Sequence, residues 1–438
     1  MAILTQEEAK KIIDKVLSYA KADETEVTLS GGRTGNIRYA RNNVSTSGET
    51  NEIGLNITSV YGKKSGSSSI NELDDESLRK AVARAEEIAM LAPENPEYMP
   101  MLGPQDYPES KTFVQSTDDI NPDYRAQIGA DSMGPSGEKN LVAAGYLEDF
   151  SGFTAMGNSK GMFGYNKSTS VDFSVTVRTA DGLGSGYAIR DYNDVNLLNS
   201  REVTNIAMQK AQASVNAQAI EPGKYTVILE PTAAGDLMGL LTRSLDARSA
   251  DEGRSFMSKK GGGTRIGEKL FDERVNIYSD PSNPIIPGAP WDNEGYPQKP
   301  VKWVENGVVK NLYYSRYWAE KQGVQPVGRP SGVIFEGGNQ SLADMISSTE
   351  RGILVTRFWY IRGVDPQTLL FTGLTRDGTF YIENGKIKFP VKNFRFNESP
   401  IIMLNNIEAL GQQQRVGGDL IPAMKIRDFT FTSLSDAV

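Results

Sequence analysis

The sequence predicts an α+β protein with an N-terminal helix–antiparallel-sheet domain and a β-rich C-terminal domain. Near the N-terminus, amphipathic helical patterns flank runs in which apolar and polar residues alternate. Beyond residue 224, Asn-Gly and Asp-Gly pairs recur between apolar runs, which is typical of β-hairpins. Because helices and strands are segregated rather than strictly alternating, the α+β class is favoured over a parallel α/β sheet.

The chain divides into four segments by composition and periodicity. They are 1–91, an N-terminal α+β domain; 92–120, a Pro-rich connector; 121–221, a middle α+β segment; and 222–438, a β-rich C-terminal domain. The length of 438 residues is enough for two to three domains, each with its own core.

In the first segment, Thr5 and Glu8 form a capping-box pattern that predicts a helix to about Lys21. Asp74 or Asp75 begins a second predicted helix, which extends to Leu91. Between the helices the patterns predict three strands and a Ser/Gly turn: strands at 26–29, 36–40 and 52–60, and the turn at 65–69.

The remaining elements follow the same signals. In the middle segment we expect a short helix, several strands and a closing helix, at 124–132, 140–188 and 200–219. In the last segment we expect a strand at 225–230, a helix at 231–247 and a Gly-rich loop at 259–267. Three hairpin turns are predicted there, at 305–307, 376–378 and 383–385.

Composition excludes several kinds of chemistry. The chain has neither Cys nor His, so disulfides, His- or Cys-ligated zinc and Ser-His-Asp or Cys-His catalysis are impossible with its own residues. Its net charge of −8 argues against a nucleic-acid partner, which needs clustered Lys and Arg. The sequence contains no run of about 18 apolar residues, so no membrane partner is expected and the cytoplasm is the expected location.

Two loops carry candidate polar sites. Asp292 and Glu294 follow a Pro-rich stretch and either bind a cation or act as acid and base, or else bond to neighbouring backbone amides in a turn. Further on, Arg357 and Arg362 lie among aromatic residues and either grip a peptide carboxylate or form paired charges, Arg362 with Asp365, on a structural strand.

Several long motifs resemble the TldD–PmbA (TldE) family, and the resemblance covers nearly the whole chain. The motifs are Trp291-Asp-Asn-Glu-Gly-Tyr-Pro, Val304-Glu-Asn-Gly-Val-Val-Lys, Tyr314-Ser-Arg-Tyr-Trp-Ala, Leu374-Thr-Arg-Asp-Gly-Thr-Phe-Tyr-Ile-Glu-Asn-Gly-Lys and Val391-Lys-Asn-Phe-Arg-Phe-Asn-Glu-Ser. Members of this family are described as candidate modulators of DNA gyrase and as metallopeptidases.

The resemblance also distinguishes the family's two branches. The TldD branch carries H-E-x-x-x-H on a helix, and alignment on Gly235 places its two His and its Glu at Gly239, Ser244 and Leu240 of this chain. These positions form a degenerate metal motif, and the branch's C-terminal Cys ligand is missing too. The chain therefore resembles the PmbA/TldE branch.

The resemblance implies a dimeric cytosolic assembly in which a TldD-type subunit supplies zinc and unfolded peptides are cleaved in a shielded chamber. This chain is then expected to bind no cofactor and to guide peptides with Asp292, Glu294 and Arg357. Its partner is either a TldD-type subunit, in a heterodimer, or a second copy, in a homodimer. Two alternatives remain open: a homodimeric enzyme with a carboxylate-bound metal, and a protein-binding module that acts on gyrase.

Overall fold

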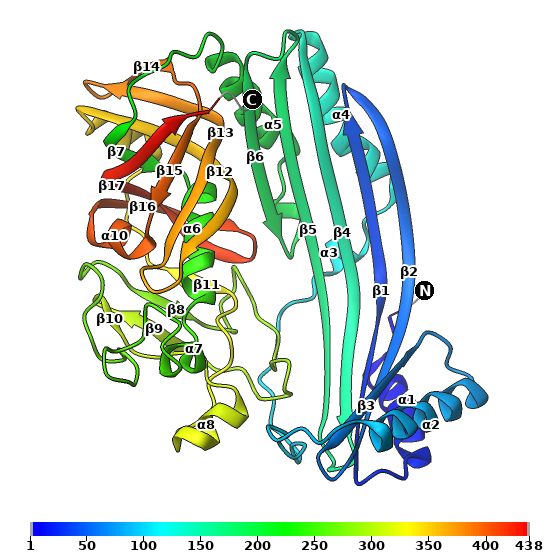
Figure 1. Cartoon of the computed structure of the whole chain (residues 1–438). Helices are drawn as coiled ribbons and strands as arrows, with labels where there is room; N and C mark the ends of the chain where they lie inside the picture. Colours follow the sequence, from blue (N-terminus) through cyan, green and yellow to red (C-terminus); the bar gives the residue numbers. More distant parts are fainter. Residues whose placement is uncertain (1–2, 436–438) are drawn as a thin grey trace.

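A six-stranded antiparallel sheet forms the first half of the molecule in the computed structural model, which describes residues 3–435. Its order is β3-β2-β1-β4-β5-β6, and Figure 1 shows β1, β2, β4 and β5 running almost the full length of the molecule. The strands are β1 (Glu24–Ala40), β2 (Asn43–Tyr61), β3 (Lys64–Ile70), β4 (Leu141–Asn158), β5 (Phe163–Thr179) and β6 (Ser185–Tyr192). Segments 1–91 and 121–221 thus share one sheet, and the four-segment division of the chain stays a prediction.

Helices pack against both ends of this sheet. They are α1 (Gln6–Tyr19), α2 (Asp75–Leu91), α3 (Gln115–Asp118), α4 (Pro122–Glu138), η1 (Val195–Leu197) and α5 (Ser200–Ala213). The predicted capping box is confirmed: the Glu8 N–H donates to Thr5 Oγ1 at 3.2 Å and the Thr5 N–H donates to Glu8 Oε2 at 2.8 Å. The α1 and α2 helices cover one apolar cluster, and α4 and α5 cover a second.

Two predictions in this half are wrong. The Ser/Gly run at 65–69 is not a turn but most of strand β3, because pairing with β2 overrides its low strand propensity. There the missing side chain of Gly66 lets the strand lie against α2, since a Cβ would come within 2.3 Å of the Ala89 nitrogen. The helix predicted at 200–219 ends at Ala213, where the Ser214 hydroxyl bonds instead to Ser185.

The second half is an eleven-stranded mixed sheet of order β10-β9-β8-β11-β17-β15-β13-β12-β7, with β14 paired to β13 and β16 to β17. An additional pairing joins β17 to β7, so β17, β15, β13, β12 and β7 form a closed ring. The strands are β7 (Gly223–Leu229), β8 (Ile277–Ser279), β9 (Val301–Glu305), β10 (Val308–Val309), β11 (Val333–Phe335), β12 (Arg351–Asp365), β13 (Leu370–Glu383), β14 (Lys386–Pro390), β15 (Phe394–Glu398), β16 (Ile407–Val416) and β17 (Asp419–Leu434).

The helices of this half are α6 (Pro231–Arg243), α7 (Ala247–Asp251), α8 (Arg316–Gln322), α9 (Leu342–Ser347) and α10 (Pro400–Asn405). The helix predicted at 231–247 instead ends at Arg243, with Ser244 as its C-cap, and the separate helix α7 begins at Ala247. The turns predicted at 305–307 and 383–385 are confirmed by the β9–β10 and β13–β14 pairings. The turn predicted at 376–378 is wrong, because these residues continue strand β13. The first half is an antiparallel sheet with helices packed against it, and the second half is rich in β-strands. This arrangement confirms the α+β class.

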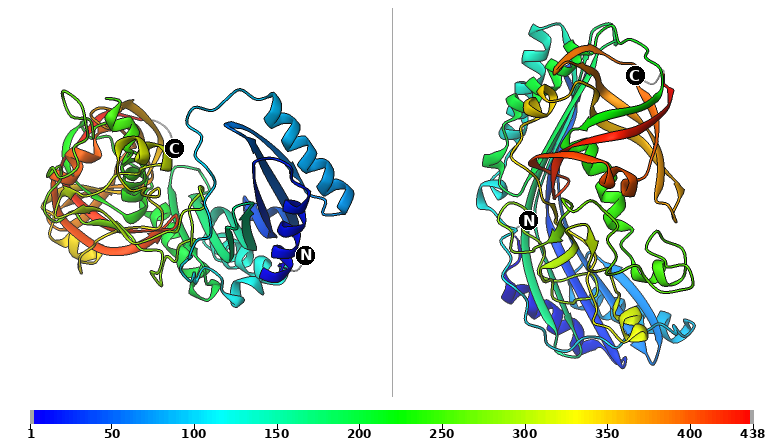
Figure 2. Two further views of the ribbon diagram at one scale, coloured as in Figure 1. Left: turned by 90° about the horizontal axis from the view of Figure 1, so that it is seen from below. Right: turned by 90° about the vertical axis from the view of Figure 1, so that its left-hand side faces the viewer.

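The two halves meet along β6, the edge strand of the first sheet that faces the second half in Figure 1, and the left view of Figure 2 shows the halves side by side. At one contact the Asp191 carboxylate of β6 accepts hydrogen bonds from the backbone N–H groups of Gly417 and Gly418, both at 2.9 Å. The Arg415 Nε also donates to it at 2.8 Å. None of the helices in the described part of the chain is long and apolar enough to cross a membrane.

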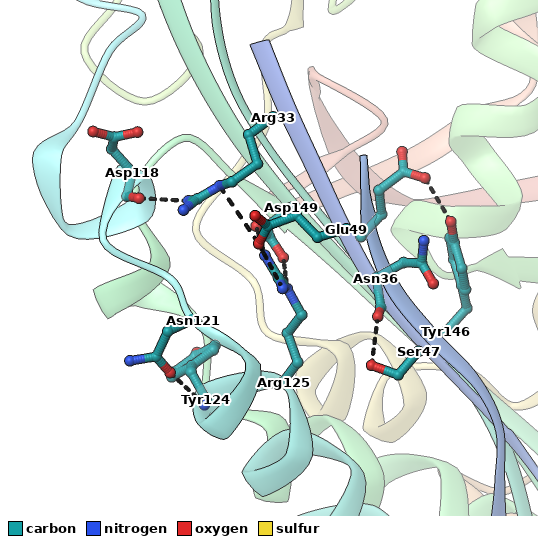
Figure 3. A network of polar contacts seen from close by, with 11 residues as sticks. Arg33, Asn36, Ser47, Glu49, Asp118, Asn121, Tyr124, Arg125, Tyr146 and Asp149 are labelled. Atoms are coloured by element: carbon teal, nitrogen blue, oxygen red, sulfur yellow. Dashed lines mark hydrogen bonds and ion pairs between the residues drawn. The ribbon is translucent and has the colours of Figure 1, made fainter. Parts of the chain in front are cut away.

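A buried arginine crosses the face of the first sheet (Figure 3). Arg125 of α4 donates two bonds to Asp149, at 2.6 and 2.9 Å, and two to Glu49, both at 3.1 Å. Glu49, Gly35 and Asp149 are direct neighbours on β2, β1 and β4, and the guanidinium lies above Gly35. A Cβ at Gly35 would come within 1.8 Å of it, so the absence of a side chain there creates the space.

Candidate functional site

The α6 helix carries the three degenerate metal-motif positions. Its inner face, with Leu237, Met238 and Leu241, is buried in the core of the second half, whereas Gly239 and Leu240 lie on the partly exposed face. Ser244 caps the helix, and its hydroxyl donates to the Leu240 carbonyl at 2.8 Å. Glycine, leucine and a hydroxyl already in use provide no strong zinc ligand, so these residues do not fit the zinc of the TldD branch.

Metal ligands are not gathered elsewhere in the described part either. Across residues 3–435, no group of three or more His, Cys, Asp or Glu side chains is placed to hold a metal ion. The carboxylate-metal alternative depended on Asp292 and Glu294. Asp292 Oδ1 instead accepts from the Glu294 and Tyr296 N–H groups, both at 2.9 Å, and Glu294 Oε2 accepts from the Arg316 N–H at 3.1 Å. These contacts fit the turn interpretation of this loop.

Asp236 lies on the same partly exposed face of α6, one turn before Gly239. Burial raises the pKa of its carboxyl to about 6, while the Phe358 N–H and the nearby Arg357 charge act in the opposite direction. The Phe358 N–H donates to Asp236 Oδ2 at 3.3 Å. Asp236 therefore keeps its proton to a higher pH than an ordinary aspartate, and when protonated it can donate to a polar group placed beside α6 as well as accept from one.

Arg357 connects the two halves of the molecule. Its Nε donates to Asp377 Oδ2 at 2.7 Å, and its guanidinium lies over the Tyr187 ring of β6, 3.8 Å from the centroid. Asp377 is fully buried and also accepts from the Ser185 hydroxyl. On the other side Arg376 lies over the ring of Trp359, which is 47% exposed. The result is a set of stacked cations and aromatic rings with one exposed aromatic edge.

Sequence reasoning missed the role of Asp377, because Asp-Gly was interpreted as a hairpin turn. The signal was partly right: Asp377 has φ 54° and Gly378 has φ 121°, conformations that Asp-Gly pairs favour. Here, however, they form an irregular position inside β13, where the two residues Asp377 and Gly378 lie opposite the single residue Thr356 of β12, and this turns the Asp377 carboxylate inward to Arg357.

Arg362 is placed away from Arg357's partners. It is exposed, lies over the Tyr360 ring at 4.1 Å and donates to the Ile361 carbonyl at 2.9 Å. The ion pair that was the alternative for Arg362 and Asp365 does not form. The Asp365 carboxylate instead accepts hydrogen bonds from the Gln367 N–H and the Thr368 hydroxyl.

The loop with Asp292 and the Arg357 cluster lie at different ends of β5. Trp291 packs against Gly164, whereas Tyr187, beneath Arg357, is paired with Thr176. These two β5 residues are separated by roughly 40 Å at about 3.3 Å per residue. The structure therefore does not bring Asp292, Glu294 and Arg357 into one contact site, and their assignment to a peptide groove stays a prediction.

A cavity of about 550 Å³ lies between α5, β6 and the second sheet, close to the start of α6. Apolar side chains such as Ile206, Leu354 and Phe380 line it, together with an ion pair in which Lys210 Nζ lies 2.6 Å from Glu230 Oε2. Its size is in the range of small-ligand pockets. Sequence patterns gave no signal for it, because Lys210 and Glu230 come from different segments.

Sequence profiles of one metallopeptidase family match three parts of the chain: PmbA/TldA metallopeptidase domain 1 over 25–89, the central domain over 117–215 and the C-terminal domain over 222–433. The fold and α6 thus define a metallopeptidase-class protein whose motif positions lack metal-binding side chains. The chain belongs to the PmbA/TldD metallopeptidase family, as its motifs indicated.

Relatives match over most of their length. The chain is 23% identical to metalloprotease PmbA of Escherichia coli O157:H7, over 97% of this chain and 98% of that protein. It is 25% identical to a metalloprotease of Methanothermobacter thermautotrophicus, over 70% of this chain and 71% of that protein.

Solved structures share the fold. TldE from Thermococcus kodakarensis superposes with a TM-score of 0.86 at 19% identity, over 97% of this chain and 99% of that one. A candidate modulator of DNA gyrase from Bacteroides thetaiotaomicron superposes with a TM-score of 0.87 at 22% identity, over 99% and 100%.

Proposed function

We propose that this chain is the non-metal-binding subunit of a cytosolic TldD-like metallopeptidase assembly that degrades unfolded peptides. The observation that carries the proposal is the composition of α6. The helix is kept, but Gly239, Leu240 and Ser244 stand where a TldD-type chain has its metal-binding motif, and no His or Cys exists elsewhere in the sequence. Zinc and bond cleavage then belong to a TldD-type partner.

The partly exposed face of α6 supports a role beside that partner. Leu240 gives it an apolar residue for subunit contact, and Asp236, with its pKa of about 6, gives it a polar group that both donates and accepts. Next to it, Arg357 and Trp359 provide a cation and a half-exposed ring. In this proposal the face helps to position an extended peptide, which offers backbone N–H and carbonyl groups along its length.

Reconstitution tests the proposal. The full chain, a TldD-type subunit with H-E-x-x-x-H from the same organism, and their mixture are each supplied with an unfolded, fluorescently labelled casein peptide. We expect turnover from the mixture alone, with zinc measured by mass spectrometry only in preparations that contain the TldD-type subunit. Stoichiometric zinc and chelator-sensitive turnover in this chain alone would contradict the proposal.

A charge on α6 tests the assigned face. Leu240→Glu puts a carboxylate on the partly exposed face beside Asp236, so we expect loss of co-purification with the TldD-type subunit. The control is Lys80→Glu on α2, whose side chain is 74% exposed in the other half of the molecule. Equal retention of the partner by both variants would place the subunit contact elsewhere.

A further inference from the structure

The helices that cover the first sheet leave a gap between its two apolar clusters. On β1, Leu29 belongs to the cluster under α1 and α2, and Ile37 belongs to the cluster under α4 and α5. Because side chains alternate along a strand, positions 31, 33 and 35 lie on the same face between these clusters. Positions 31 and 35 are glycines, so Arg33 carries the one side chain among them. A cavity of about 660 Å³ occupies this gap, between the start of α1 and α3.

Arg33 lines this cavity with hydrogen-bond donors that stay unused. Its Nη2 donates to the Asp118 carbonyl, whereas its Nη1 makes no hydrogen bond within residues 3–435. Its buried Nε also lacks a hydrogen-bond partner there, because Glu49 Oε2 lies 4.0 Å away. Figure 3 shows the guanidinium with Asp118 on one side and Glu49 on the other. Enclosed donors are normally satisfied, so these groups indicate a ligand that carries an acceptor.

Two carboxylates beside Arg33 keep acceptor capacity toward the same cavity. Glu49 accepts from Arg125 through Oε2 at 3.1 Å, and its Oε1 accepts from no residue in the described part of the chain. The Asp118 carboxylate accepts from the Ser151 hydroxyl at 2.5 Å and from the Gln115 amide at 3.3 Å. An ionised carboxylate has about four acceptor sites, so both can also accept from a ligand ammonium.

A second cation and an apolar wall complete the lining. Lys167 makes no ion pair with a described residue, and its Nζ lies 4.0 Å from the centroid of the Phe113 ring. The charged side chains of the lining are therefore two cations and two carboxylates, a balance that favours a ligand with one charge of each sign. The remaining lining includes the apolar or aromatic side chains of Ile3, Leu4, Phe113 and Tyr165.

We propose that this cavity binds a free α-amino acid with an apolar side chain. Its carboxylate accepts from Arg33 and Lys167, its ammonium donates to Glu49 and Asp118, and its side chain packs on the apolar wall. Both charges of an α-amino acid are attached to one carbon atom, which matches a guanidinium with a carboxylate directly beside it. A dipeptide separates its charged ends by a further residue, about 3.5 Å when extended. The site lies in the first half, away from α6, and it does not depend on the proposed function.

A ligand series tests which groups are recognised. Isothermal titration of the full chain, without any partner protein, should show one saturable site for L-leucine and L-phenylalanine with a Kd below about 1 mM. Phenylalaninamide lacks the carboxylate and N-acetylphenylalanine lacks the ammonium, so each should bind about tenfold more weakly or worse. L-serine, which lacks the apolar side chain, and leucyl-leucine, whose charges are further apart, should be weakened to a similar degree.

Three variants locate the site. Arg33→Gln should weaken phenylalanine binding by about tenfold or more, because it removes the guanidinium that holds the carboxylate. Lys167→Met should weaken it by about threefold, and this side chain is exposed, so the fold should be kept. Arg38→Gln is the matched control, since Arg38 is an exposed arginine of the same strand outside the cavity lining. Thermal unfolding midpoints show that each variant is folded.

Several outcomes would overturn the proposal. They are a chain that binds neither amino acid, N-acetylphenylalanine or leucyl-leucine that binds as tightly as the free amino acids, and equal losses from Arg33→Gln and Arg38→Gln. If Arg33→Gln does not fold, unchanged binding by Lys167→Met would overturn it instead. Because every titration uses this chain alone, a failed reconstitution of peptide turnover would contradict the proposed function and leave this result unaffected.

Discussion

Each half of the molecule has an arginine beside a fully buried aspartate, but the two arginines have different surroundings. Arg125, in the first half, makes four bonds to two carboxylates, those of Asp149 and Glu49, and its side chain is 2% exposed. Arg357, in the second half, shares Asp377 with Arg376 and otherwise stacks between aromatic rings, with its side chain 15% exposed.

The comparison teaches how surroundings separate a structural arginine from a binding one. A guanidinium flanked by two carboxylates has its charge balanced and its donors used, so it holds strands and helix together. A guanidinium that stacks on rings and shares one carboxylate with a second arginine keeps positive potential near the surface. We therefore assign Arg125 to the fold and Arg357 to the candidate site.

The largest expected effect is from Arg125→Met. Loss of the guanidinium leaves Asp149, 1% exposed, without its partner, so the free energy of unfolding should fall by about 3–5 kcal/mol in urea titrations. Gly35→Ala should destabilise the chain through the same contact, because its Cβ would collide with Arg125, whereas Gly48→Ala, which meets nothing, should be close to neutral. A similar cost for both alanine variants would mean that Arg125 does not occupy the space above Gly35.

Compared with Arg125→Met, Arg357→Met should lower the free energy of unfolding less and should lower peptide turnover more. Asp377 keeps the Ser185 hydroxyl and nearby Arg376, so we expect a loss of about 2 kcal/mol in the same titration. In the reconstituted assembly, peptide turnover per folded molecule should fall, whereas Arg125→Met should leave it unchanged at a temperature where the variant is folded. If both arginines change turnover equally, the distinction between them fails.

The smallest expected effect is a pH dependence from Asp236→Asn. The folded-state pKa of Asp236 is raised from 3.8 to about 6, so the folded state binds the proton more tightly than the unfolded state. The stability that this contributes is full below pH 4 and is lost as pH rises through about 6. Because Asp236 is partly exposed, we expect the parent to lose about 1–2 kcal/mol more than Asp236→Asn over this range.

The pH dependence of the free energy of unfolding must be compared between parent and variant, because the pKa values of Asp172 and Asp419 are raised to about 6 as well. Both remain in Asp236→Asn, so the difference between parent and variant isolates Asp236. Parallel stability curves for the two proteins would show that Asp236 is solvated like an ordinary carboxylate.

Local signals predicted much of the fold. The Thr5 capping box, the Asp74 N-cap of α2 and the Asn-Gly turn at 384–385 depend on neighbouring residues, and all three are present. β3 was missed because its Ser/Gly sequence has little strand propensity, and only pairing with β2 makes it a strand.

The candidate site was less predictable, because most of its contacts join residues that are distant in the sequence. The degenerate positions on α6 followed from a local motif, but Arg357 meets Tyr187 from the other half of the molecule and Arg125 needs Gly35, ninety residues earlier. Asp377 shows the limit clearly: Asp-Gly fixed the backbone conformation, yet it could not tell a turn from an irregular strand. Contacts between distant residues are set by the tertiary fold, which no single window of sequence contains.

The closed ring of strands also sets the order in which the second half can form. β7, its first strand, pairs with β17, its last, across about 190 residues of intervening chain. A ribosome must therefore release nearly the entire polypeptide before that junction can be made, and until then β7, with its apolar Val227, Ile228 and Leu229, can pair only with β12. Folding of this half is expected to be slow and post-translational, with chaperone demand concentrated on β7.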